Sequence, residues 1–120
     1  VLVHGGGPQI DEQMARQGKA VERIDGLRVT DAEALDIVRM VLVGKINREL
    51  VSAVNALEPV AVGVAGEDGR LLEAAPIDPK LGFVGKVGNV RAGLLHALLD
   101  DGLVAESPCR VTRSRRSRCD

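Results

Sequence analysis

The sequence has 120 residues, close to the usual size of one domain, so two separate domains are not expected. Hydrophobic residues make up 45% and charged residues 28%, which excludes a disordered chain, a coiled coil and a fibrous protein. Phe83 is the single aromatic residue, so the core must be aliphatic, and the base stacking used by single-strand nucleic-acid binders is almost excluded. The apolar runs are too short to span a membrane, and no signal-peptide pattern is seen, so we expect a soluble, cytoplasmic protein with no membrane partner.

The net charge of −1 is unevenly distributed along the chain. Residues 1–107 hold 11 Lys and Arg against 16 Asp and Glu, whereas residues 108–120 hold five Arg and one Asp. Both cysteines, Cys109 and Cys119, also lie in the basic stretch. Its arginines raise the alternative of nucleic-acid binding through phosphates, but the acidic body gives this little support, and we expect no nucleic-acid partner.

The first predicted elements are a strand, a turn and a helix. The strand covers residues 1–3, the turn consists of three glycines at residues 5–7, and the helix begins at Pro8 and ends at Gly18. Residues 19–29 predict a loop that contains a short strand or hairpin.

A second helical region begins at a capping-box sequence in which Thr30 is followed three residues later by Glu33. Gly44 interrupts the apolar periodicity and Pro59 ends it, so two helices or one bent helix fit equally well. The apolar stripe comprises residues 35, 38, 41, 42, 46, 50, 54 and 57.

The remaining chain predicts more strands and one more helix. Residues 60–65 form a buried strand, and residues 71–74 can return as its hairpin partner. A short strand at 83–87, a helix at 89–101 that ends at Gly102, and a strand from residue 103 complete the pattern. This alternation indicates an α/β fold with a mainly parallel sheet.

The glycine turn is the first candidate site, because open α/β sheets bind ligands where a strand ends and a helix begins. Backbone N–H groups at Gly6 and Gly7 can surround an anion, and the helix dipole favours negative charge there, although a plain tight turn is an equally good interpretation. The neighbouring His4 is expected to form a local hydrogen bond that shapes the loop.

Arg28 is the second candidate, because it lies between Leu27 and Val29 just before a capped helix and its planar guanidinium suits bidentate binding of a carboxylate. On local sequence alone, a surface arginine paired with an acid is the more common case. Lys45 and Asn47 are expected to be solvated on a helix surface.

Four ordered segments resemble the acetylglutamate kinases, the arginine-pathway branch of the amino acid kinase family. They are residues 4–8 (HGGGP), 25–30 (DGLRVT), 41–47 (VLVGKIN) and 81–85 (LGFVG), and the resemblance extends from Val1 to about Val104. It implies a three-layer αβα fold, incomplete here, in which residues 1–106 are the acetylglutamate-binding part of the kinase domain.

The resemblance also implies an activity. Such kinases transfer the γ-phosphate of ATP, with Mg²⁺, to the side-chain carboxylate of N-acetyl-L-glutamate. Carried onto this sequence, Gly6 and Gly7 offer backbone N–H groups to the substrate and the phosphoryl group, Arg28 binds the α-carboxylate, and Leu27 lines the pocket. The helices around residues 30–57 resemble elements that the family uses in dimer contacts, so we expect a homodimer or a higher homo-oligomer.

The sequence also departs from the family pattern. The Lys-x-Gly-Gly loop, the second lysine and the nucleotide-binding half find no match, so we expect the catalytic lysines and the main ATP site to lie outside this chain, no metal ligands within it, and no activity from it alone. Residues 107–120 are interpreted as an aberrant, disordered basic tail. The alternatives are another amino acid kinase, against which Arg28 in the GLRVT segment argues, and a non-catalytic binding domain of the same fold.

Overall fold

The computed structural model describes residues 1–108. Most of the tail expected at residues 107–120, including Cys109 and Cys119, therefore lies outside the described residues. In chain order, the elements are β1 (Leu2–His4), α1 (Gly7–Arg16), β2 (Arg23–Ile24), β3 (Leu27–Arg28), α2 (Ala32–Arg39), the π-helical η1 (Met40–Asn47), α3 (Arg48–Asn55), β4 (Ala61–Gly63), the 3₁₀ turn η2 (Asp68–Arg70), β5 (Leu72–Pro76), the 3₁₀ turn η3 (Pro79–Leu81), β6 (Gly85–Val90), α4 (Gly93–Asp100) and β7 (Val104–Pro108).

A parallel three-stranded sheet in the order β1-β7-β4 forms the centre of the molecule. Leu2 and Gly63 both pair with Glu106 of β7, from opposite sides. Two antiparallel pairs, β2-β3 and β5-β6, lie outside this sheet. The α/β class, the parallel sheet and the short hairpin between residues 19 and 29 are therefore confirmed.

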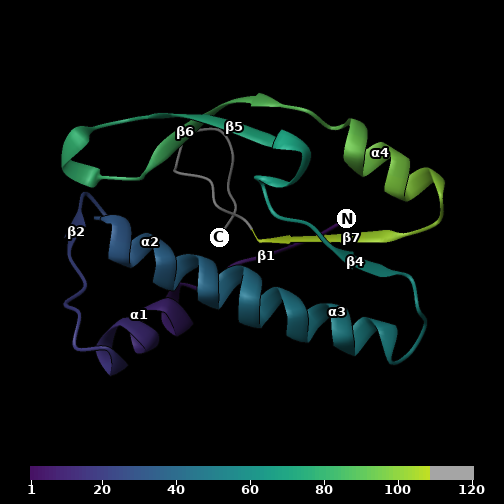
Figure 1. Ribbon diagram of the computed structural model, residues 1–120, viewed down its shortest axis with the longest axis horizontal. Coiled ribbons are helices and arrows are strands. Elements are labelled where there is room, and N and C mark those ends of the chain that lie inside the picture. Colours follow the sequence, from purple (N-terminus) through teal and green to yellow (C-terminus); the bar gives the residue numbers. More distant parts are fainter. Residues whose placement is uncertain (109–120) are drawn as a thin grey trace.

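Two layers cover the sheet on opposite sides (Figure 1). The long helix α2–η1–α3 lies on one side, and the β5–β6 hairpin lies with α4 on the other. One aliphatic cluster joins α1, α2 and η1 and consists of Ile10, Met14, Ala34, Ile37, Val38, Val41 and Leu42. The other joins β4, β7 and α4 and is centred on Val64, Leu71 and Ala105, with Leu95 and Leu98 packed against them. The sheet is thus the middle of three layers.

The hairpin prediction for residues 71–74 was wrong about the partner. Residues 72–74 belong to β5, which pairs with β6 in antiparallel register, whereas β4 pairs with β7. After β4 the chain turns through η2, where the amide of Leu72 donates to the carbonyl of Gly66 at 2.7 Å. That turn carries the chain out of the central sheet and into the layer above it.

The long helix is continuous from Ala32 to Asn55, because η1 adopts a π-helical conformation where Gly44 was expected to interrupt the periodicity. Its N-cap is Asp31, one residue after the predicted Thr30, and the Asp31 carboxylate accepts a hydrogen bond from the amide of Ala34 at 2.8 Å. The predicted apolar stripe stops early, since Leu57 is 91% exposed.

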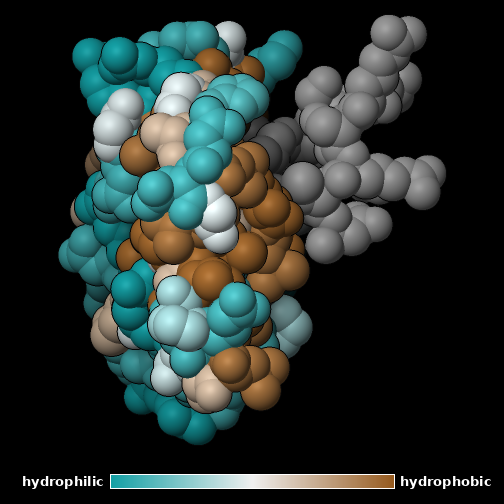
Figure 2. All heavy atoms as spheres, turned by 90° about the vertical axis from the view of Figure 1, so that its right-hand side faces the viewer, coloured by the Kyte–Doolittle hydropathy of each residue, from teal (hydrophilic) through white to brown (hydrophobic). Residues whose placement is uncertain are grey.

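Apolar side chains also reach the surface at one end of the molecule, as Figure 2 shows. Leu94 and Leu99 of α4 and Leu2 of β1 are among the large exposed hydrophobic residues. Within residues 1–108, no helix combines the length and the apolar character needed to cross a bilayer.

Candidate functional site

A cavity of about 370 Å³ lies between the glycine turn, the β2–β3 hairpin, the long helix and the β5–β6 hairpin. Its volume falls within the range of small-ligand pockets. It is lined by Gly5, Gly6, Gly7, Ile10, Leu27, Arg28, Thr30, Val38, Leu42, Ala74, Phe83, Val84 and Gly85. The structure thus brings Gly6, Gly7 and Arg28, three residues selected from the sequence, to one cavity.

The glycines of the turn differ in what surrounds them. A Cβ at Gly6 would lie 2.5 Å from Ile46 Cδ1 and 2.6 Å from Leu42 Cδ2, so the turn packs closely against the long helix. A Cβ at Gly7 would meet no atom within 4 Å. Gly6 therefore fixes the position of the turn, whereas the space beside the Gly7 Cα is open.

Arg28 reaches the cavity from β3, and its side chain is only 14% exposed. Nη2 forms an ion pair with Asp11 Oδ1 and lies 3.4 Å from the carbonyl oxygen of Gly7. Nε is buried and donates to no acceptor among residues 1–108. The guanidinium is therefore held at one nitrogen and has an unused donor.

Asp11, on the first turns of α1, is bound by two arginines, because Arg23 Nη2 also donates to Asp11 Oδ2 at 2.6 Å. Burial by itself raises the pKa of Asp11, but the hydrogen bonds from Arg23 and Arg28 outweigh it and hold the pKa below its ordinary value. Asp11 is thus ionised at neutral pH and ties the β2–β3 hairpin to α1.

This shift predicts how the contribution of Asp11 to stability depends on pH. A carboxyl group whose pKa is lowered by folding stabilises the protein above its unfolded pKa, and that contribution disappears as the pH falls through the folded pKa. We expect Asp11→Asn to lower the free energy of unfolding at about pH 7, and the difference from wild type to shrink below about pH 4. Denaturant melts across this range test it, and a difference that stays constant to about pH 2 contradicts it.

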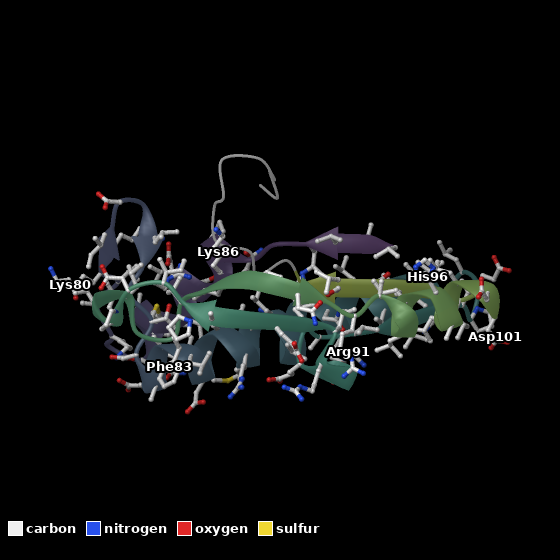
Figure 3. The ribbon with its side chains drawn as sticks, turned by 90° about the horizontal axis from the view of Figure 1, so that it is seen from above. Lys80, Phe83, Lys86, Arg91, His96 and Asp101 are labelled. Atoms are coloured by element: carbon white, nitrogen blue, oxygen red, sulfur yellow. The ribbon has the colours of Figure 1, made fainter. Side chains whose placement is uncertain are left out.

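A backbone link closes the cavity between the start of the long helix and the β5–β6 hairpin. The amide of Thr30 donates to the carbonyl of Leu81 at 2.9 Å, and the amide of Phe83 donates to the carbonyl of Thr30 at 2.7 Å. Phe83 is 60% exposed and lies near the tip of the hairpin, whereas His96 lies at the far end on α4 (Figure 3). Phe83 borders the cavity, and the exposed His96 takes no part in it.

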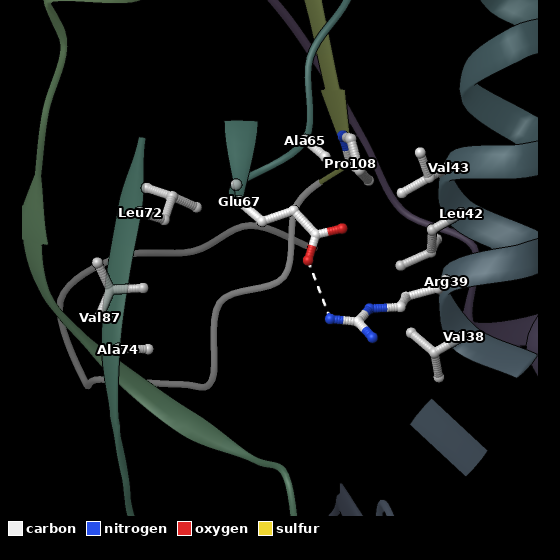
Figure 4. A pocket seen from close by; sticks show the side chains of 11 residues that line it. Val38, Arg39, Leu42, Val43, Ala65, Glu67, Leu72, Ala74, Val87 and Pro108 are labelled. Atoms are coloured by element: carbon white, nitrogen blue, oxygen red, sulfur yellow. Dashed lines mark hydrogen bonds and ion pairs between the residues drawn. The ribbon is translucent and has the colours of Figure 1, made fainter. Parts of the chain in front are cut away.

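A second, smaller cavity of about 200 Å³ lies beside the first and shares Val38, Leu42 and Ala74 with it. Its lining is aliphatic except where Arg39 of α2 pairs with Glu67 at 3.0 Å (Figure 4). Both partners are more than half exposed, so this ion pair contributes little to stability.

His4, next to the glycine turn, forms a polar contact with Asn47, whose Nδ2 lies 3.4 Å from His4 Nε2. His4 Nδ1 lies 3.2 Å from the carbonyl oxygen of Gly5, which confirms the expected local hydrogen bond. Asn47 is 1% exposed rather than solvated, and its Nδ2 donates to the backbone oxygen of Glu106 at 2.9 Å. Asn47 therefore fastens η1 to β7, whereas Lys45 is exposed as expected.

Comparison with known proteins agrees with this geometry. The family model described as "Amino acid kinase family" matches residues 1–111, which is most of the chain. The chain belongs to the amino acid kinase family. The expected fold class and the recognised resemblance are thereby confirmed.

Curated relatives of this amino acid kinase chain carry the name acetylglutamate kinase, and two of them show the extent of the match. The protein from Acaryochloris marina is 52% identical over 103 residues, which are 85% of this chain and 36% of the relative. The chloroplastic protein from Arabidopsis thaliana is 50% identical over 106 residues, covering 87% of this chain and 30% of the relative. The chain thus spans about a third of the length of the relatives it matches.

Solved structures show the same arrangement. The match to the crystal structure of smu.665 from Streptococcus mutans UA159 covers 90% of this chain and 44% of the smu.665 chain. Its TM-score is 0.84 at 23% identity, which shows a shared fold. The match to the N-acetylglutamate synthase from Neisseria gonorrhoeae, complexed with coenzyme A and N-acetyl-glutamate, covers 90% of this chain and 25% of the synthase chain. Its TM-score is 0.71 at 26% identity.

Proposed function

We propose that this chain forms the acetylglutamate-binding part of an acetylglutamate kinase, an enzyme that transfers the ATP γ-phosphate to the side-chain carboxylate of N-acetyl-L-glutamate in arginine biosynthesis. The observation that carries the proposal is the cavity that brings the glycine turn and Arg28 together. The names of the relatives from Acaryochloris and Arabidopsis support the choice of substrate.

The cavity can supply two kinds of contact to such a substrate. Arg28 offers a buried positive charge with a free Nε donor, which suits a carboxylate that must be held in one orientation. The turn at Gly6 and Gly7 offers backbone amides at a helix N-terminus, where the dipole stabilises negative charge. Phosphoryl transfer depends mainly on positioning and on neutralising charge, so these contacts orient the accepting carboxylate.

ATP with Mg²⁺ enters this proposal as co-substrate. Among the described residues, no three or more His, Cys, Asp or Glu side chains come together to hold a metal ion. Because the lysine motifs and the nucleotide-binding half of the family find no match in this sequence, we assign to residues 1–108 only the binding and orientation of the acceptor and propose that the catalytic lysines and the nucleotide site lie elsewhere in the complete gene product.

The role of Arg28 can be tested by substitution in the complete gene product. We expect Arg28→Ala to weaken the binding of N-acetyl-L-glutamate by about 10- to 100-fold, because hydrogen bonds to a charged partner contribute about 1.5–3 kcal/mol. Arg28→Lys should recover only part of this loss, since lysine keeps the charge but not the planar fork. Calorimetric titration measures both, and trapping of the acyl phosphate with hydroxylamine reports the reaction.

Arg16→Ala is the matched control, because Arg16 pairs with Glu12 on the exposed side of α1 and lies outside the cavity. We expect its affinity for N-acetyl-L-glutamate to equal that of the wild type. An Arg28→Ala protein that binds the acid as tightly as this control does refutes the assignment.

A binding domain without kinase activity is the second candidate. The similarity to the Neisseria N-acetylglutamate synthase favours it, because that protein is a synthase by name. ATP-dependent formation of acyl phosphate by the complete gene product separates the two functions. The expected homo-oligomer and the cytoplasmic location stay predictions.

A further inference from the structure

We propose that Asp11 is a positioning residue that orients Arg28 toward the carboxylate of the bound substrate, and that Arg23 holds Asp11 in place for this purpose. The inference rests on the proposed function, because it names the residues through which the substrate-binding arginine acts. Neither Asp11 nor Arg23 lines the cavity, so both act through Arg28.

The three side chains form a chain of ion pairs from the surface to the cavity. The exposed fraction of the side chain falls from 45% at Arg23 to 34% at Asp11 and 14% at Arg28. Asp11 offers one carboxylate oxygen to each arginine, with Oδ2 facing Arg23 and Oδ1 facing Arg28. The Asp11 carboxylate, which Arg23 holds in place, therefore binds the buried guanidinium of Arg28.

The way in which Asp11 contacts Arg28 leaves the Nε donor for a ligand. The Nε–H and one Nη2–H bond of a guanidinium lie along one edge of its plane, and a bound carboxylate can accept from both. Asp11 takes up Nη2 only, and Nε has no acceptor among the described residues although it is buried. A buried donor without a partner is costly in free energy, and a ligand carboxylate at Nε removes that cost.

Without Asp11, little in the described chain fixes the orientation of Arg28. The remaining hydrogen bond of its side chain in the described chain is the one between Nη2 and the carbonyl oxygen of Gly7, at 3.4 Å. An arginine side chain with this much freedom must lose rotamer entropy when it binds a ligand, which weakens binding. The effect falls on the contact with the carboxylate and not on the rest of the ligand.

The test compares two ligands by calorimetry on the complete gene product: N-acetyl-L-glutamate and its analogue with a carboxamide in place of the α-carboxylate. We expect wild type to prefer the acid, and Asp11→Asn to reduce that preference by about tenfold through weaker binding of the acid alone. Arg23→Gln should reduce it in the same direction by a smaller factor, and it decides the question if Asp11→Asn does not fold.

Glu12→Gln is the matched control, because it removes one carboxylate from the same helix, from an exposed ion pair with Arg16. Its preference for the acid should equal that of the wild type. Equal weakening of both ligands in Asp11→Asn indicates a purely structural role and overturns the inference, as does an unchanged preference. A preference that rises means that Asp11 competes with the ligand for Arg28, and it also overturns the inference. Failure of the wild type to bind the acid refutes the proposed function instead.

Discussion

Gly82→Ala should lower the free energy of unfolding by at least about 2 kcal/mol, because alanine has neither the space nor the backbone freedom that this position requires. Gly82 has φ +65° and ψ −126°, a conformation that side chains rarely allow. An added Cβ would lie 2.3 Å from the carbonyl oxygen and 2.9 Å from the carbonyl carbon of Thr30. These are backbone atoms, so no side-chain rotation relieves the contact.

The change should also open the cavity. Gly82 lies between Leu81 and Phe83, whose backbone hydrogen bonds with Thr30 join the hairpin to the long helix. Gly88→Ala is the control, since a Cβ at Gly88 meets no atom within 4 Å and its φ is not positive. Urea melts of both variants test the prediction, and equal midpoints contradict it.

Glu106→Leu should raise the free energy of unfolding by about 1–3 kcal/mol, because burying a polar group that makes no hydrogen bond costs about that much in proteins. Glu106 is 0% exposed, and neither of its carboxylate oxygens has a hydrogen-bond partner among residues 1–108. Its neighbour Ala105 faces α4, so alternation along the strand turns Glu106 toward η1. Two buried carboxyl oxygens without a hydrogen-bond partner among residues 1–108 therefore lie in the middle strand of the sheet.

Two further variants identify the cause of this expected gain. Glu106→Gln keeps two polar atoms without partners, so it should stabilise less than Glu106→Leu. Glu58→Leu makes the same substitution at an exposed position and should change stability by less than about 0.5 kcal/mol. Denaturant melts rank the four proteins, and a destabilised Glu106→Leu contradicts the prediction.

Local signals in the sequence were enough for most of the fold. Apolar spacing and helix-ending residues predicted α1 and α4, whose C-terminal glycines Gly18 and Gly102 have φ values of +70° and +78°. The pairing of residues 71–74 could not be found this way, because the choice between β4 and β6 depends on the path of the turn through η2. The π-helical form of η1 was also missed, and η1 packs against β7 and α1, contacts that apolar periodicity does not reveal.

The site was predictable where one residue type carries the chemistry and was missed where a partner comes from elsewhere in the chain. Gly6, Gly7 and Arg28 stood out by type and position, and they meet at the cavity. Asp11, the partner of Arg28, did not stand out in the sequence, because it is 17 residues away and looks like an ordinary acid in the first turns of a helix. Asn47, expected on a surface, is buried by a contact with β7, 59 residues away.

The position of β7 between β1 and β4 bears on how the protein emerges from the ribosome. Leu2 and Gly63 have the same neighbour in the sheet, Glu106, so neither strand can pair with β7 until more than 100 residues have been synthesised. Such long-range pairing slows folding and leaves apolar strands unpaired during synthesis. The nascent chain is therefore expected to need chaperone protection until its last described strand inserts between the first and the fourth.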